Sequence, residues 1–228
     1  MKKVILLAAV AVMAVFSANA QGKWYIGTSG IGNGFFTGGA EGGSITSAGF
    51  VDPNTGAVTN PYNFMTGFAM TKDASVWGIA PEIGYNINND WSVGLGLGVT
   101  GIKFGKDAKT AMSFGVNPYV RWFAWRNNNF AFYAQGDVQY AAFNVKDGSM
   151  DPNTFEPATL KSSSFSVAIK PGIAYTFNEH FSMTATVGAL GYTQTSANSF
   201  DDSKNVSEKG VFGLNINGGL QFGLTYTF

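Results

Sequence analysis

The sequence predicts an all-β protein, an eight-stranded antiparallel up-and-down transmembrane β-barrel. Three observations lead to this fold. Apolar and polar residues alternate through eight segments, short and long connections alternate between these segments, and the ionisable residues within the segments all fall on one face. Alternation with a period of two is typical of a strand whose two faces meet different surroundings. Strands of soluble sheets alternate as well, so the prediction depends on the three observations together.

The first twenty residues have the features of a secretory signal peptide. Lysines near the start precede an apolar core over 4–16, and small residues follow at Ala18 and Ala20. A transmembrane anchor is the alternative, but the apolar core is shorter than the ~20 residues that a membrane helix needs. We expect cleavage between Ala20 and Gln21, which leaves 21–228 as the barrel domain.

The composition of the chain excludes several classes of protein. Charged residues make up only 12% of the sequence, aromatic residues reach 15%, and there are 30 glycines and no cysteine. The absence of cysteine excludes disulfides, thiolate metal sites and a lipid-anchor cysteine. No excess of basic residues indicates a surface for nucleic acid. Low charge with many aromatic residues is instead what a barrel in a membrane requires.

The alternation defines each strand and its outward row. The predicted strands, in chain order, span about 23–30, 76–87, 91–101, 112–125, 130–145, 163–177, 181–193 and 211–228. Their outward rows begin, in the same order, near Trp24, Trp77, Trp91, Phe114, Phe130, Phe165, Phe181 and Leu220. Each row continues at every second residue. In the seventh strand, for example, it consists of Phe181, Met183, Ala185, Val187 and Ala189.

The connections between the strands differ in length in a regular way. The short ones are 88–90, 126–129 and 178–180, and they alternate with long ones near 31–75, 102–111, 146–162 and 194–210. With an even number of strands, all the short turns and both chain ends fall at one end of a barrel. Short periplasmic turns and longer external loops are typical of outer-membrane barrels.

Four ionisable residues lie within the strands, and all four fall on the inward face: Glu82, Arg121, Asp137 and Lys170. A charge facing lipid at mid-membrane costs ~2–4 kcal/mol, which explains their exclusion from the outward rows. Glu82 and Arg121 lie at similar heights above their short turns, as do Asp137 and Lys170 on neighbouring strands. We therefore expect two interior ion pairs, Glu82–Arg121 and Asp137–Lys170, alone or merged into one network.

Prolines and glycines add two further expectations. Pro81, Pro118 and Pro171 each precede an outward aromatic residue by four positions, and proline cannot donate to a strand ladder, so we expect bulges or unpaired positions there. Inward glycines leave space in the lumen for the large side chains Tyr119, Arg121, Phe123 and Tyr133. These glycines are Gly84, Gly94, Gly96, Gly98, Gly115, Gly172 and Gly188.

The sequence gives little support for catalysis. The single histidine, His180, falls in a short turn, where a solvated residue is the simpler interpretation than a catalytic base. No group of residues has the spacing of metal ligands. We expect no enzymatic activity, no cofactor and no metal.

The signal peptide, the eight alternating strands and the Tyr226-Thr227-Phe228 end resemble the small Gram-negative outer-membrane β-barrel family, the OmpA/OmpX-like barrels. The resemblance implies location in the bacterial cell outer membrane and contact with outer-membrane lipid and lipopolysaccharide. It also implies that the barrel-assembly machinery recognises the last strand through Phe222, Leu224, Tyr226 and Phe228. The long loops would contact an extracellular partner.

An eight-stranded barrel is only wide enough for its own side chains, so a large open pore is not expected. Three functions remain. The first is a structural or surface-interaction barrel with a filled lumen. The second is a narrow pore or conduit for small solutes or small apolar molecules, in which the ion pairs act as a gate, as proposed for relatives. The third is an outer-membrane enzyme.

Overall fold

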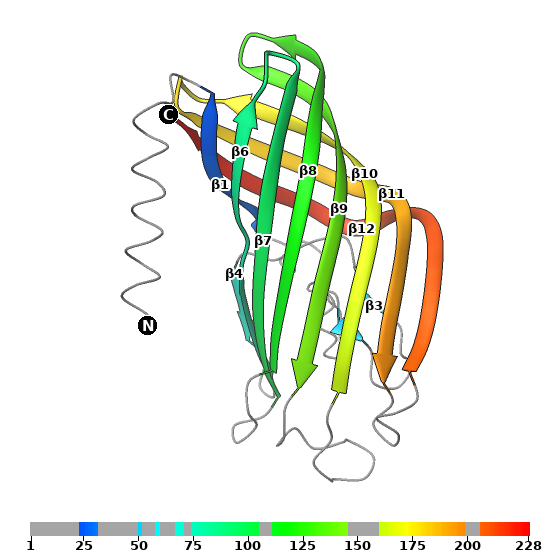
Figure 1. The fold of residues 1–228 in the computed structure, drawn as a ribbon. Coiled ribbons are helices and arrows are strands. Elements are labelled where there is room, and N and C mark those ends of the chain that lie inside the picture. Colours follow the sequence, from blue (N-terminus) through cyan, green and yellow to red (C-terminus); the bar gives the residue numbers. More distant parts are fainter. Residues whose placement is uncertain are drawn as a thin grey trace.

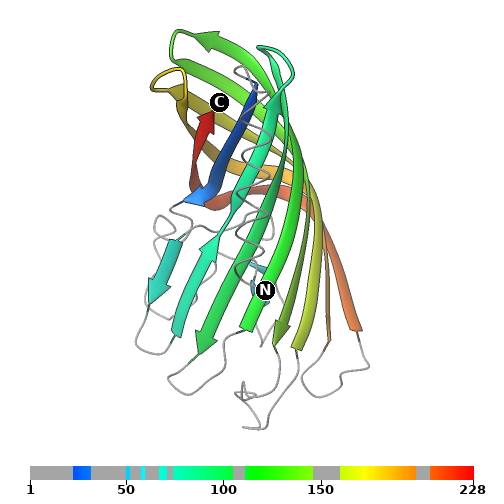
Figure 2. The same cartoon turned by 60° about the vertical axis from the view of Figure 1, so that its left-hand side comes forward.

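The chain forms a closed antiparallel β-barrel in a computed structural model (Figures 1 and 2). The structure describes residues 23–31, 50–51, 58–59, 67–70, 74–104, 111–145, 160–198 and 206–228. The strands are β1 (Trp24–Ile31), β2 (Phe50–Val51), β3 (Val58–Thr59), β4 (Gly67–Met70), β5 (Ala74–Ile79), β6 (Pro81–Asn86), β7 (Trp91–Phe104), β8 (Ala111–Asn127), β9 (Phe130–Val145), β10 (Leu160–Thr176), β11 (Phe181–Asn198) and β12 (Val206–Thr227). No helix in these described ranges is long and apolar enough to cross a membrane.

Eight strands make up the ring in the described part of the chain. Their order is β6-β1-β12-β11-β10-β9-β8-β7, and pairing of β6 with β7 closes the circle. β5 and β6 count as one strand because both pair with β7 and are separated only at Ala80. β4 pairs with β5 beside the ring, and β2 pairs with β3 in a separate two-stranded sheet. The predicted closed eight-stranded antiparallel barrel is confirmed.

The three short turns and the C-terminus lie at one end of the barrel, which we call the turn end (Figure 1). The side-chain oxygen of Asn88 accepts hydrogen bonds from the backbone N–H groups of Asp90 and Trp91. Asn178 caps the β10–β11 turn in the same way. The backbone N–H of Phe228 donates to the carbonyl of Trp24 at 3.0 Å, so the first and last strands also meet here. We call the opposite end the loop end.

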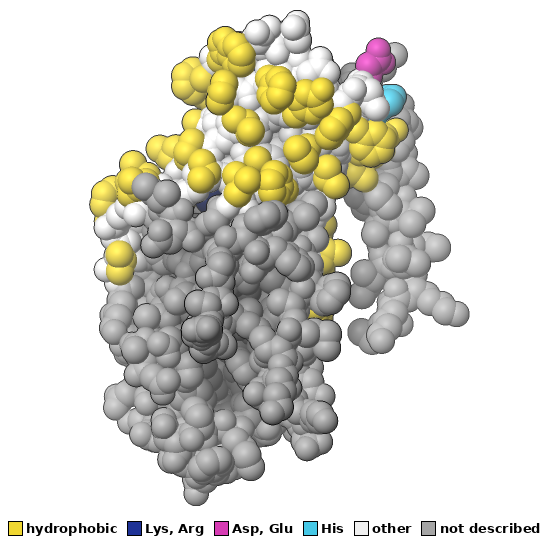
Figure 3. Space-filling model, turned by 180° about the vertical axis from the view of Figure 1, so that it is seen from behind, with side chains coloured by type: hydrophobic (Ala, Val, Ile, Leu, Met, Phe, Trp, Pro, Cys, Tyr) yellow, Lys and Arg dark blue, Asp and Glu magenta, His cyan; other side chains and the backbone are white. Residues whose placement is uncertain are grey.

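The strands alternate as predicted, with apolar side chains outside and small or polar side chains inside. Figure 3 shows hydrophobic side chains over the turn-end half of one face. Two residues of the predicted outward row of β11 are buried. Ala185 is 5% exposed although it pairs with the outward Ile173. The predicted direction of Ala189 is wrong, because this residue is only 2% exposed and packs against the inward Ala168. The reason is the register shift between Val187 and Ala189, where Gly188 adopts a positive φ of 66°. The alternation therefore reverses, and Leu190 takes the outward position.

The three prolines lie where the strand pairing is interrupted, as expected. Pro81 follows the break at Ala80 between β5 and β6. Pro171 falls within the register shift between Ile169 and Gly172 of the β10–β11 pair. Pro118 falls in a gap of the β8–β9 pairing.

The seam between β1 and β12 is short. Paired residues run from Tyr25 with Thr227 to Ile31 with Phe222, where β1 ends. β12 itself is irregular, because two residue steps on β11 (Val187 to Ala189) match five on β12 (Leu220 to Asn215). Gly30 has a positive φ of 69° and lies within the register shift of β1 between Thr28 and Ile31.

Candidate functional site

The structure brings the four inward charges together as two ion pairs. Nη2 of Arg121 lies 3.1 Å from Oε2 of Glu82, and Nζ of Lys170 lies 2.7 Å from Oδ2 of Asp137. All four residues are 5% exposed or less. β6 contributes Glu82 and β8 contributes Arg121, whereas Asp137 and Lys170 come from β9 and β10. Buried charges are tolerated only when they are paired in this way.

Gln135 joins the two pairs into one network. Its Oε1 accepts a hydrogen bond of 2.7 Å from Nε of Arg121, and its Nε2 donates one of 3.0 Å to Oδ2 of Asp137. The same oxygen of Asp137 therefore accepts the hydrogen bond of Gln135 and forms the ion pair with Lys170. Sequence analysis did not identify Gln135, because an uncharged inward residue has no feature that distinguishes it from other inward residues. The available signal was that Gln135 lies two positions before Asp137 on β9, so both side chains face inward and are neighbours on that face.

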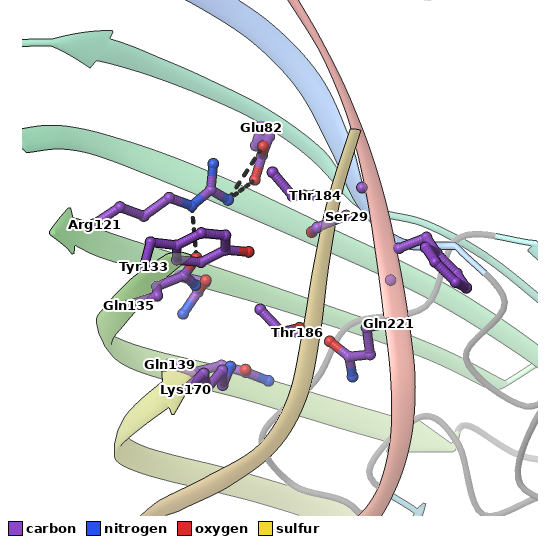
Figure 4. Close-up of a pocket in the computed structure, with 14 residues that line it drawn as sticks. Ser29, Glu82, Arg121, Tyr133, Gln135, Gln139, Lys170, Thr184, Thr186 and Gln221 are labelled. Atoms are coloured by element: carbon purple, nitrogen blue, oxygen red, sulfur yellow. Dashed lines mark hydrogen bonds and ion pairs between the residues drawn. The ribbon is translucent and has the colours of Figure 1, made fainter. Parts of the chain in front are cut away.

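Tyrosine rings enclose the guanidinium group of Arg121. Its Cζ lies 4.4 Å from the ring centre of Tyr119 and 5.7 Å from that of Tyr133, within the range of cation–π attraction. The hydroxyl groups of Tyr25 and Tyr119 are hydrogen bonded at 2.9 Å. Figure 4 shows Arg121 between Glu82, Gln135 and the ring of Tyr133. Together, Tyr25, Glu82, Tyr119, Arg121, Tyr133, Gln135, Asp137 and Lys170 make a layer across the lumen, which we call the plug.

Glycine positions make room for the plug. A Cβ atom at Gly94 would overlap the ring of Tyr119, and one at Gly172 would overlap that of Tyr133. Gly84 accommodates Tyr25 in the same way, a residue that the sequence analysis did not place in the lumen. Gly188 does not serve this purpose, because it forms the irregularity between β11 and β12.

The plug separates two cavities. One, of about 30 Å³ and partly open to solvent, lies on the loop-end side, and its lining includes Asn117, Gln139 and Gln221 (Figure 4). The other, of about 390 Å³ and also partly open, lies at the turn end, and we call it the vestibule. Arg121 and Thr184 line both cavities. The barrier between them is therefore one side-chain layer thick at this point.

Aromatic side chains surround the turn end on the outer surface. Ring centres lie 5.0 Å apart in Trp24–Tyr85, 6.2 Å in Trp91–Trp122, 4.7 Å in Phe130–Tyr175 and 5.0 Å in Phe181–Tyr226. We call this set the turn-end girdle. Its members lie beside the short turns and the two ends of the described chain.

A second set of aromatic residues lies nearer the loop end, with exposed fractions from 40% to 73%. Six strands contribute one residue each: Trp77, Phe114, Tyr140, Phe165, Tyr192 and Phe212. Phe165 pairs directly with Tyr140, Tyr192 pairs with Phe212, and Trp77 pairs with Gly101. We call this set the loop-end girdle. Sequence analysis missed it because the register between strands, which brings these residues to a similar level, cannot be read from the residues alone.

The other predicted residues lie as follows. Phe222, Leu224 and Tyr226 alternate with buried Gln221 and Thr225 along the end of β12. Phe228 packs edge-to-face on Tyr226, with ring centres 5.4 Å apart. The expected cleavage position at Ala20–Gln21 lies outside the described residues. Within the described ranges, no group of His, Asp and Glu residues is arranged to hold a metal ion.

His180 is a structural turn residue in the described part of the chain. Its ring stacks on Tyr226, with centres 5.4 Å apart. Nδ1 lies 2.8 Å from the carbonyl oxygen of Thr227. The β10–β11 turn is thereby fastened to the end of β12.

A family model described as "Protein of unknown function (DUF3575)" matches residues 59–226, which is most of the chain. The chain belongs to this family. The DUF3575 match covers the strands from β4 to nearly the end of β12, and therefore the whole plug except Tyr25.

Comparison with curated proteins gave no match. Two solved structures are similar to this DUF3575 chain. The N-terminal β-barrel domain of Pseudomonas aeruginosa OprF is 11% identical, with a TM-score of 0.38 over 92% of this chain and 100% of that one. The outer membrane protein OprG from Pseudomonas aeruginosa is 18% identical, with a TM-score of 0.44 over 90% of this chain and 96% of that one.

Proposed function

We propose that this protein is an outer-membrane β-barrel with a structural or surface-interaction role and a lumen closed by the plug. The main support for a location in the outer membrane is the pair of aromatic girdles on the outer surface. Eight residue steps separate Phe114 from Trp122 on β8, and ten separate Phe165 from Tyr175 on β10. At about 3.3 Å per step and a tilt of ~45°, these correspond to roughly 19–23 Å of height, close to the ~25 Å apolar band of such barrels.

The outer surface between the girdles suits hydrocarbon. Its outward residues include Leu95, Leu97, Val116, Val167 and Ile169, each between 41% and 57% exposed. In water, apolar side chains exposed on every strand of a domain would cause aggregation. In lipid, the same side chains are in their preferred environment, and the closed ring leaves few backbone groups without partners.

The turn end faces the periplasm in this proposal, because short turns are typical of the periplasmic side. Single cysteines at Glu179, an exposed turn residue, and at Asp151, in a long connection, test the orientation. On intact cells, a membrane-impermeant thiol reagent should label the cysteine at Asp151 and should reach the one at Glu179 only after permeabilisation. Equal labelling at both positions contradicts the orientation.

The plug supports a structural role rather than a pore, because its four charged residues form two ion pairs and its tyrosine rings lie across the lumen. A narrow pore is the second candidate, since only one side-chain layer separates the two cavities. Conductance in planar bilayers distinguishes them. Neither the wild-type barrel nor Arg121→Ala should conduct steadily, and the variant should unfold at a lower urea concentration because Glu82 loses its partner. A steady conductance of the wild-type barrel supports the pore.

We also propose that the apolar row of the last strand (Phe222, Leu224, Tyr226 and Phe228) is read by the barrel-assembly machinery. Lipopolysaccharide and other outer-membrane lipids are the proposed surroundings of the outer face. An extracellular partner would bind through the long connections at the loop end.

A further inference from the structure

We propose that the vestibule is a binding site for a ligand that carries an oxyanion, either a carboxylate or a phosphate. The vestibule has a volume of about 390 Å³, and it is open toward the turn end. Sites for small molecules are generally ~300–1,000 Å³. The site shares Arg121 with the plug, but the closure of the lumen needs no ligand.

Two guanidinium groups with unused donors line the vestibule. Arg121 donates through Nε to Gln135 and through Nη2 to Glu82, while its Nη1 has no acceptor among the described residues. The side chain of Arg126 makes no hydrogen bond or ion pair with a described residue, and the carboxylate of Asp90 in the β6–β7 turn acts on it through its charge. An arginine presents up to five N–H donors in a planar fork that fits carboxylate and phosphate. Both side chains therefore have donors available for an oxyanion.

A β-bulge directs Arg126 into the vestibule. The register of β8 with β9 shifts between Phe123 and Trp125, so Trp125 points outward and Arg126 falls opposite the buried Ala131. Without the extra residue, Phe123 and Arg126 would lie on opposite faces of the strand. With it, the guanidinium carbon of Arg126 lies 4.0 Å from the ring centre of Phe123. Such stacking holds the cation in place without using its hydrogen-bond donors.

Ser92 provides the independent observation that points to a ligand. The residue is 1% exposed, it lines the vestibule, and its Oγ has no hydrogen-bond partner among the described residues. A buried hydroxyl group without a partner costs free energy, which a polar atom of a ligand in the vestibule would recover by a hydrogen bond. Hydroxyl and amide groups such as Thr225, Thr227 and Asn88 line the rest of the wall. The ligand is therefore polar beyond its oxyanion.

One acidic residue also lines the vestibule. Glu179 lies in the exposed β10–β11 turn, at the mouth. Its negative charge repels an incoming anion, so the direction in which its removal changes the affinity can be tested. Removal of Glu179 should strengthen the binding that removal of Arg126 weakens.

Calorimetric titration of the refolded full-length mature chain in detergent micelles tests the proposal. The probes are inorganic phosphate and citrate, with chloride at equal ionic strength as the reference. We expect saturable binding of at least one probe, weakened tenfold or more in Arg126→Gln and strengthened about twofold in Glu179→Gln. Phosphate binding alone assigns the phosphate class, and citrate binding alone assigns the carboxylate class.

Lys23→Gln is the matched control, because Lys23 is an exposed cation at the same end of the barrel that does not line the vestibule. It should bind the probe like the wild type. Each variant is first shown to be folded by its urea midpoint. The proposal is overturned if neither probe binds more than chloride does, or if Arg126→Gln and Lys23→Gln weaken binding equally.

Discussion

The hydroxyl groups of Tyr25 and Tyr119 meet 2.9 Å apart inside the barrel, where they connect β1 with β8. β1 and β8 are not neighbours in the ring, since β6 and β7 lie between them. The hydrogen bond therefore links separate parts of the wall across the lumen. It lies beside the guanidinium of Arg121, which stacks on the ring of Tyr119.

This contact predicts an energetic coupling between the two tyrosines. Tyr25→Phe removes one hydroxyl and leaves the buried hydroxyl of Tyr119 without that partner, which should cost about 1–3 kcal/mol. The double variant with Tyr119→Phe should cost less than the sum of the single variants, because no hydroxyl is then left unpaired. Urea unfolding in micelles measures all three variants. Strictly additive costs would mean that the hydrogen bond contributes no coupling.

Two glycines of β7 should respond very differently to replacement by alanine. Gly94→Ala places a Cβ atom within the ring of Tyr119, which should cost about 1–3 kcal/mol of stability. Gly96→Ala is the matched control on the same strand and face, because its Cβ would meet its nearest neighbours at 3.6 Å, an ordinary contact. The control should be neutral or slightly stabilising. Similar urea midpoints for the two variants would contradict the packing described for Tyr119.

Replacement of Gln135 should lower the stability of the barrel more than its neutral side chain suggests. Gln135→Leu removes an acceptor from Arg121 and a donor from Asp137, and hydrogen bonds to charged groups contribute about 1.5–3 kcal/mol each. Gln139→Leu is the control, since Gln139 is also buried and inward but its side chain has no hydrogen bond with a described residue. Equal loss of stability in both variants would show that the bridge does not couple the ion pairs.

The C-terminal residue should affect assembly in the cell. Deletion of Phe228 should lower the amount of folded protein in the outer membrane several-fold, because the last strand loses the end of its apolar row. Refolding of the purified variant in micelles separates this effect from stability, and it should proceed as for the wild type. Unchanged abundance of the heat-modifiable folded form in cells would contradict the role of Phe228.

The sequence predicted the ring of strands and the inward charges because both depend only on a period of two along each strand. The pairing of Arg121 with Glu82 followed from their similar heights above the turns. The position of Ala189 was predicted incorrectly, because a positive φ at Gly188 reverses the alternation and one glycine among 30 gives no sign of it. Gln135 and the loop-end girdle depend on which residues face each other across strands. That register is set by bulges, such as the one between Phe123 and Trp125, which alternation does not reveal.

The central claim is that hydrocarbon surrounds the barrel between the two girdles, and nitroxide accessibility along β10 tests it most directly. Labels would be placed at Phe165, Val167, Ile169, Ile173 and Tyr175 of the protein in lipid vesicles, all on the outward row. The ratio of collision with oxygen to collision with a water-soluble nickel complex should peak near Ile169 and fall toward Phe165 and Tyr175. A flat profile, or free access of the nickel complex at Ile169, would contradict the claim.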